Sequence, residues 1–166
     1  MKKMKKIITL IFIAFALNAT AQKITKAEII ATGLTCSMCS NAIYKQLKTT
    51  DGVDSVKTDL NKNMFIVFLS ETKNVSPVVL KEKIEKAGFF VGSFEAYFNF
   101  SNIIVSENKQ IGNYIFLDAK SQKLNGIAKV KILNKGFVTV KEFKKLQKTY
   151  ASIYEKESNL IFIKLI

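Results

Sequence analysis

The chain has 166 residues, with 26 lysines, 13 acidic residues, two cysteines and no arginine, histidine or tryptophan. The absence of histidine excludes Ser-His-Asp and Cys-His catalysis and a zinc finger built from cysteine and histidine. The absence of arginine excludes a bidentate guanidinium clamp on phosphate or carboxylate. Hydrophobic residues make up 48% and charged residues 23% of the sequence, as in a globular protein of one domain or two small ones.

The N-terminus has the three-part pattern of a secretory signal peptide. Four lysines lie within the first six residues, an apolar run interrupted only by Thr9 extends over 7–17, and Ala19-Thr20-Ala21 follows as a cleavage motif. The apolar run is much shorter than the roughly 20 residues that a membrane-spanning helix needs. We therefore expect a signal peptide over residues 1–21, cleavage near Ala21 and export, to the periplasm or an equivalent compartment. No second apolar stretch approaches that length, so no membrane span is expected in the mature chain.

Charge divides the mature chain into two parts. Residues 22–95 contain ten lysines and eight acidic residues, whereas residues 96–166 contain twelve lysines and five acidic residues. This asymmetry favours two units with different surfaces. The lysine-rich second unit suits contact with an acidic partner or a membrane surface. Export and the lack of arginine argue against nucleic acid as a partner.

The first unit alternates strand-like and helix-like segments. Ser76 is a candidate N-cap, Pro77 suits the first helical position and Gly88 suits the helix end. The resulting order β-α-β-β-α-β predicts a ferredoxin-like fold. The predicted elements are a strand at 24–34, a helix at 39–48, strands at 53–60 and 64–69, and a helix that begins at Pro77 and ends before Gly88. A fourth strand starts with residues 89–95.

The second unit, residues 96–166, is predicted to be a small α+β unit. It should pack against the fourth strand of the first unit, because the segment 96–102 is rich in Phe and Tyr and lacks the glycine or proline of a flexible linker. Burial of Phe94, Phe98 and Phe100 would hold the two units together. The predicted elements are strands at 103–105, 114–117, 127–133 and 136–140, a helix over 140–153 and a strand at 160–165.

The chemistry of the sequence is concentrated in Cys36-Ser37-Met38-Cys39, which contains both thiols of the chain. A C-x-x-C pair at a strand-to-helix junction lies at a helix N-terminus, where backbone N–H groups and the helix dipole favour thiolate. Two thiolates form a soft site for Cu(I) or another thiophilic ion. The same pair can also form a disulfide, so the motif alone leaves both chemistries open.

Three stretches of the chain resemble the heavy-metal-associated domain family. The first resembles the family's G-M-T-C-x-x-C loop, the second its G-V-x-x-V element and the third the A-G-Y/F end of its second helix. The resemblance covers residues 24–95. This family includes soluble copper chaperones, amino-terminal modules of copper-pumping ATPases and periplasmic mercury-binding proteins, and its fold is ferredoxin-like. The three stretches are 33–39 (GLTCSMC), 51–56 (DGVDSV) and 87–89 (AGF).

The resemblance implies that Cys36 and Cys39 are the metal ligands. Leu34 stands where the family has an inward-pointing methionine, and Phe89 occupies a position near the metal loop. Met38 is either a third sulfur ligand or, as we favour, an exposed residue that contacts a partner. The expected function is binding of Cu(I), or alternatively Hg(II), and its transfer by thiolate ligand exchange to a metal-transporting or metal-accepting protein. Such a protein is not an enzyme.

Two other classes of function remain open from the sequence. Export to an oxidising compartment suits a periplasmic thiol–disulfide oxidoreductase. Against it, no tryptophan precedes the C-x-x-C, and the only proline, Pro77, begins a helix and so cannot be the cis-proline of a thioredoxin-like site. The third class is an interaction module in which residues 97–166 bind a partner and the metal loop is vestigial.

Overall fold

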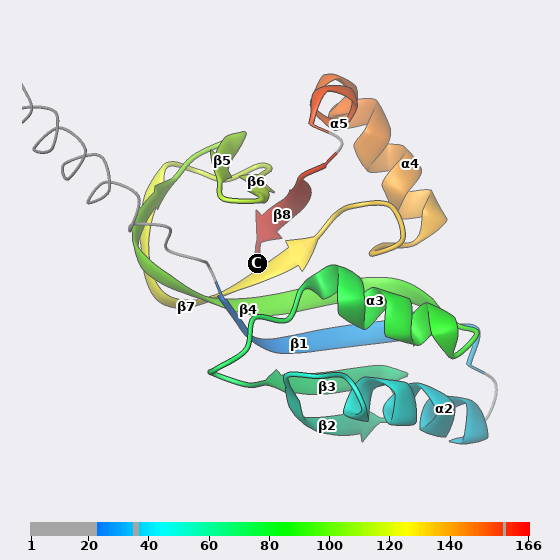
Figure 1. Cartoon of the computed structure of the whole chain (residues 1–166). Helices are drawn as coiled ribbons and strands as arrows, with labels where there is room; N and C mark the ends of the chain where they lie inside the picture. The colour runs from blue at the N-terminus through cyan, green and yellow to red at the C-terminus, as the bar shows by residue number, and fades with distance from the viewer. Residues whose placement is uncertain (1–22, 35–36, 158) are drawn as a thin grey trace, which may run out of the picture.

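The computed structural model describes residues 23–34, 37–157 and 159–166. Their strands form one eight-stranded sheet in the order β2-β3-β1-β4-β7-β8-β6-β5 (Figure 1). Helices and strands are both present, and the expected α+β class is confirmed. The elements are β1 (Lys23–Thr32), α2 (Ser37–Lys48), β2 (Val53–Asp59), β3 (Met64–Leu69), α3 (Pro77–Lys86), β4 (Phe90–Val105), β5 (Lys109–Ile111), β6 (Tyr114–Phe116), β7 (Gln122–Ile132), α4 (Val140–Thr149), α5 (Ala151–Lys156) and β8 (Ile161–Leu165).

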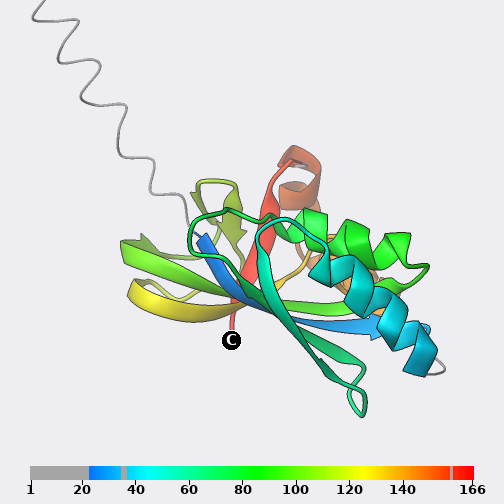
Figure 2. The same cartoon turned by 60° about the horizontal axis from the view of Figure 1, so that its bottom comes forward.

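The first half of the sheet has the expected ferredoxin-like arrangement. Strand β1 lies between β3 and β4 and is antiparallel to both, and α2 and α3 lie next to each other on one face of these strands (Figures 1 and 2). Helix α2 buries Ile43 and Leu47, and helix α3 buries Leu80 and Ile84, in each case on the stripe of positions that faces the sheet. This packing places the start of α2 at one end of the sheet.

Helix α3 begins and ends where the sequence predicts. The hydroxyl of Ser76 accepts a hydrogen bond of 3.3 Å from the backbone N–H of Val78, and Pro77 is the first helical residue. After the helix, Gly88 adopts a φ of +90°, which is readily accessible only to glycine. Local capping chemistry therefore sets both ends of this helix.

Strand β4 connects the two halves of the molecule. It is 16 residues long and pairs with β1 along one edge and with β7 along the other. The expected unit boundary between residues 95 and 96 falls inside this strand, and the segment predicted as a separate strand at 103–105 is its end. Phe94, Phe98 and Phe100 are all buried, as expected.

The second half of the sheet is covered by helices on the other face. Neighbouring residues of a strand point to opposite faces, and those of β6 divide between two clusters accordingly. Phe116 joins the core beneath α2 and α3, whereas Ile115 joins a second core. That second core packs against the apolar side of α4 and α5, including Phe143 and Tyr154. The molecule thus has one sheet with a different helix pair on each half.

Two predictions for the second half are wrong, and one strand is missing from them. Residues 136–140 do not form a strand: they belong to a loop in which Gly136 has a φ of +82°, and Thr139 caps α4 by accepting a hydrogen bond from the N–H of Glu142. The helix predicted over 140–153 is two helices, because the backbone leaves helical geometry at Tyr150. Strand β5 was not predicted, since its exposed residues show no apolar alternation.

A polar network joins the two halves on the face opposite α2 and α3. The carboxylate of Glu28 accepts hydrogen bonds from Lys26 at 2.9 Å and from the hydroxyl of Tyr97 at 3.1 Å, and it pairs with Lys129 at 2.9 Å. Lys129 also pairs with Glu95 at 2.5 Å. Burial alone would raise the pKa of Glu28, but these hydrogen bonds outweigh it and lower the pKa to about 2. The network therefore spans β1, β4 and β7.

We predict that Phe98→Ala destabilises both halves together. The Phe98 ring is fully buried and lies 4.9 Å from the ring of Tyr114 on β6, so its loss leaves a cavity in the shared core. The expected loss in the free energy of unfolding is about 3–5 kcal/mol. Urea unfolding gives this value, and hydrogen exchange should show lower protection in both β3 and β8. Phe90→Ala, at a 67% exposed position, is the control. Loss of protection in only one half would contradict a shared core.

A second prediction concerns the pH dependence of stability. The pKa of Glu28 is lowered from 4.5 to about 2, so its ionised form stabilises the folded state fully above pH 4.5. That contribution is lost as the pH falls from 4.5 towards 2. Glu28→Gln should therefore cost about 1–3 kcal/mol at neutral pH. Urea unfolding should show that the difference in the free energy of unfolding between the variant and the unsubstituted protein shrinks steadily through this acid range. A difference that is independent of pH would show that Glu28 does not act through its charge.

Candidate metal centre

Helix α2 positions one of the two predicted ligands. It begins at Ser37, and Cys39 lies in its first turn with a half-buried side chain. No acidic residue is present in that turn, so no carboxylate of the turn destabilises a thiolate there by charge repulsion. Cys36, the other predicted ligand, and Thr35 lie outside the described residues. The helix is held against the sheet by the buried side chains of Ile43 and Leu47.

The chain reaches this turn through Gly33, which follows β1. Gly33 has a φ of +86°, a conformation that most side chains avoid. A Cβ at Gly33 would lie 3.9 Å from Cδ1 of Phe89. Phe89 therefore lies against the strand-to-helix connection, as the resemblance implies for this position. Leu34 and Phe89 are both partly buried and pack against the main core. Leu34 thus has the supporting position expected of it.

Two exposed apolar side chains flank this region. Met38, in the first turn of α2, is 81% exposed, and Phe90, at the start of β4, is 67% exposed. The hydroxyl of Thr32 donates a hydrogen bond of 3.3 Å to the carbonyl oxygen of Phe90, so the end of β1 and the start of β4 are held together. The sequence predicts a strand at Phe90, but the exposure of its side chain is not among the predictions. The available signal was the pair Phe89-Phe90, because adjacent residues of an extended chain face opposite ways.

The donor chemistry of the chain leaves few alternatives for a metal site. Among the described residues, no group of three or more cysteine, aspartate or glutamate side chains is arranged to hold a metal ion, and the sequence contains no histidine. Sulfur donors are limited to two thiols and the methionine thioethers. A site containing Cys39 would therefore be soft and of low coordination number, which suits Cu(I) or Hg(II) better than Zn(II).

Residues 28–90 match the family model of the heavy-metal-associated domain. The resemblance seen in the sequence is thereby confirmed for this part of the chain. The heavy-metal-associated domain ends where β4 begins, so most of β4 and all later elements lie beyond the matched residues. The candidate metal loop and Phe89 lie within them.

The comparisons with individual proteins concern the same part of the chain. The copper-exporting P-type ATPase of Staphylococcus saprophyticus is 38% identical over 64 residues, which cover 38% of this chain and 8% of the ATPase. The solution structure of a yeast copper transporter domain, solved in apo and Cu(I)-loaded states, shows 32% identity and a TM-score of 0.35, covering 42% of this chain and 89% of that domain. The CopZ metallochaperone shows 25% identity and a TM-score of 0.38, covering 40% of this chain and 98% of its own.

The helices of the described chain are of modest length. Within the described part of the chain, no helix has both the length and the apolar character needed to cross a membrane. The longest of them is α2, with 12 residues.

Proposed function

We propose that this chain binds Cu(I) through the thiolates of Cys36 and Cys39 and passes it to a partner protein. The observation that carries the proposal is the position of Cys39 in the first turn of α2, within a segment that matches the heavy-metal-associated domain. The similarity of that segment to copper-transporting proteins supports copper as the metal. The proposed activity is binding and transfer, without chemical conversion of a substrate.

Transfer is proposed to proceed by ligand exchange. Two thiolates around Cu(I) leave open coordination positions, so a thiolate of the partner can bind the ion before one of the first two sulfurs leaves. Copper stays in the Cu(I) state, and each departing cysteine is replaced by one incoming thiolate. The 81% exposure of Met38 beside Cys39 suits contact with the approaching partner.

We further propose that the protein works outside the cytoplasm after removal of residues 1–21. An oxidising compartment favours a disulfide between the two cysteines, and a disulfide sulfur has no thiolate charge with which to bind Cu(I). Metal binding there requires that the pair be reduced. The reductant, or metal loading before oxidation, would then control when the site is usable.

We predict that replacing both cysteines abolishes tight Cu(I) binding. Reduced Cys36→Ser/Cys39→Ser protein should fail to compete with a chromogenic Cu(I) chelator, whereas the unsubstituted protein should take up one ion per chain. Met38→Leu is the matched control, because it removes the neighbouring sulfur and keeps an apolar side chain of similar size. It should change the Cu(I) affinity by less than about threefold if Met38 is not a ligand.

The same titration separates the alternatives. Equal Cu(I) affinity in the double serine variant would overturn the proposed site. Tighter binding of Hg(II) with no measurable Cu(I) uptake would identify a mercury-binding protein. Catalysed reduction or formation of a disulfide in a test protein, lost in the same variant and unaffected by Cu(I), would identify an oxidoreductase instead.

A further inference from the structure

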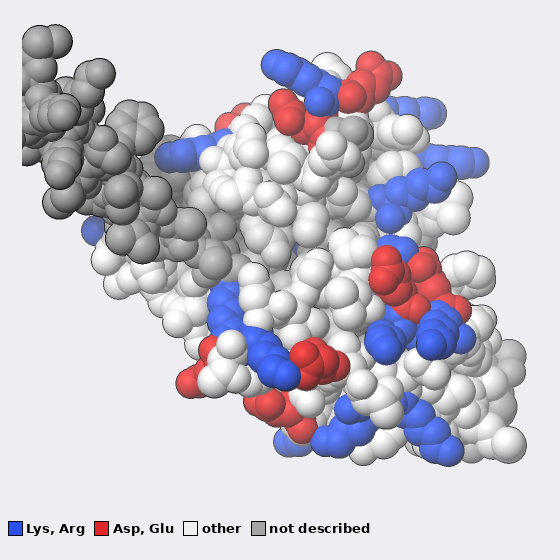
Figure 3. Space-filling model, in the orientation of Figure 1, with Lys and Arg blue, Asp and Glu red and all other residues white. Residues whose placement is uncertain are grey.

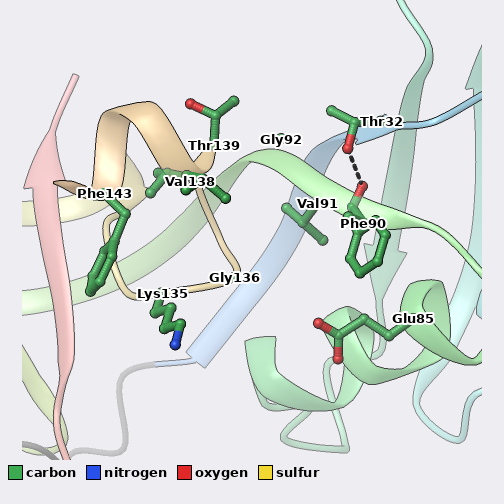
Figure 4. A pocket seen from close by; sticks show the side chains of 11 residues that line it. Thr32, Glu85, Phe90, Val91, Gly92, Lys135, Gly136, Val138, Thr139 and Phe143 are labelled. Atoms are coloured by element: carbon green, nitrogen blue, oxygen red, sulfur yellow. Dashed lines mark hydrogen bonds between the residues drawn. The ribbon is translucent and has the colours of Figure 1, made fainter. Parts of the chain in front are cut away.

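A cavity of about 360 Å³ lies between the two halves of the molecule (Figure 4). Its volume is at the lower end of the range of ligand pockets. Phe90 and Val91 from the start of β4 line one side, and Val138 and Phe143 line the other. Most of the lining is therefore apolar. One side is formed by residues at the end of the heavy-metal-associated domain or directly after it, and the other by residues 135–143.

The cavity adjoins the candidate metal centre. Thr32 lines it and directly precedes Gly33, whose backbone lies against Phe89. The exposed ring of Phe90 lies at the same end of β4. A molecule that occupies the cavity would therefore lie close to the chain leading into the metal loop.

The edge of β4 beside the cavity has no strand partner among the described residues. Strand β7 pairs with β4 from Glu95 onwards, whereas the segment 90–94 pairs only with β1 among the described strands. The loop that follows β7 passes beside this edge and contributes Gly136 to the cavity wall. An unpaired strand edge next to an apolar pocket is the arrangement by which proteins bind extended peptides.

One face of α4, next to the cavity, is strongly basic. We call the exposed side chains of Lys141, Lys144, Lys145 and Lys148 the lysine face. None of them forms an ion pair with another described residue. The one acidic residue of α4, Glu142, is already engaged by Lys131 at 2.6 Å. In Figure 3, lysine side chains project from the right-hand side of the molecule over α4.

We propose that the cavity and the lysine face together bind an extended, acidic segment of the protein with which metal is exchanged. An apolar side chain of that segment enters the cavity, and its carboxylates pair with the lysine face. Charge complementarity selects an acidic occupant, and exposed Val140 at 74% extends the apolar lining to the surface. This inference rests on the proposed metal-transfer function and identifies the chemistry of the partner.

The concave shape favours a peptide over a membrane. A lipid surface can contact the lysine face, but it leaves the cavity beneath Val140 and Phe143 unfilled and offers no backbone groups to the edge of β4. An extended partner segment can contact the lysine face, fill the cavity and offer backbone groups to the edge of β4 at the same time. It would also lie beside Gly33 and so bring the partner close to the metal loop.

The test uses the reduced full chain and a fluorescein-labelled nonapeptide. The peptide has a central phenylalanine flanked by valines, with glutamates at both ends, and a second peptide has lysines in place of the glutamates. Fluorescence anisotropy at low salt should show binding of the acidic peptide only, weakening as salt is added. NMR should show shifted amide signals at Val91, Gly92 and residues 135–139.

Two triple variants of equal net charge test the lysine face. Lys141→Glu/Lys144→Glu/Lys145→Glu should weaken binding of the acidic peptide by about tenfold or more, because three attractive charges become repulsive. The matched control replaces the exposed lysines at 109, 120 and 123 with glutamate, near the opposite end of β4, and should change the affinity by less than about twofold. Val140→Glu, at an exposed position that tolerates substitution, should weaken binding by about fivefold.

The outcomes distinguish this proposal from the metal site itself. Both triple variants should bind Cu(I) as tightly as the unsubstituted chain, so that loss of peptide binding with intact Cu(I) binding supports a separate docking surface. Equal weakening by the two triple variants, amide shifts away from the cavity, or no binding of the acidic peptide would overturn the proposal. Binding to vesicles of phosphatidylglycerol and phosphatidylcholine through the lysine face, without peptide binding, would assign that face to a membrane instead.

Discussion

The structure depends on the pairing of β4 along both of its edges. β4 alternates large aromatic residues towards the core, Phe94, Phe98 and Phe100, with polar residues such as Glu95 and Tyr97 on the other face. A shift of its register by one residue would exchange these two sets, so the pairing with β1 and β7 is strongly specified. Because the same core side chains serve both halves, the sheet continues through the point at which the charge of the sequence changes.

This constraint determines what lies beside the candidate metal centre. Strand β1 leads into the candidate metal loop, and the chain after β7 leads through residues 133–139 into α4. Since β1 and β7 flank the same strand, α4 is held next to the start of β4. The network of Glu28, Lys129 and Glu95 adds electrostatic support on the open face. The residues after the heavy-metal-associated domain therefore supply one wall of the cavity, and Thr32, which precedes the candidate metal loop, also lines it.

The candidate site could be predicted from the sequence only where its residues are close together along the chain. The C-x-x-C motif, the glycine before it and the role of Phe89 all follow from short motifs. The cavity could not be predicted, because Thr32, Phe90, Val138 and Phe143 come from separate segments that only the sheet brings together. No local periodicity predicts that the pairing of β7 with β4 ends at Glu95.

The sequence by itself determined the features that depend on neighbouring residues. Ser76 and Pro77 begin α3, Gly88 ends it, and alternating apolar residues define the strands, because capping bonds and backbone preferences act over a few residues. Tertiary structure alone decided that β4 continues past residue 95 and that the chain leaves helical geometry at Tyr150. These outcomes depend on pairing and packing between distant segments, whose energies exceed local preferences of a few tenths of a kcal/mol to about 1 kcal/mol per residue.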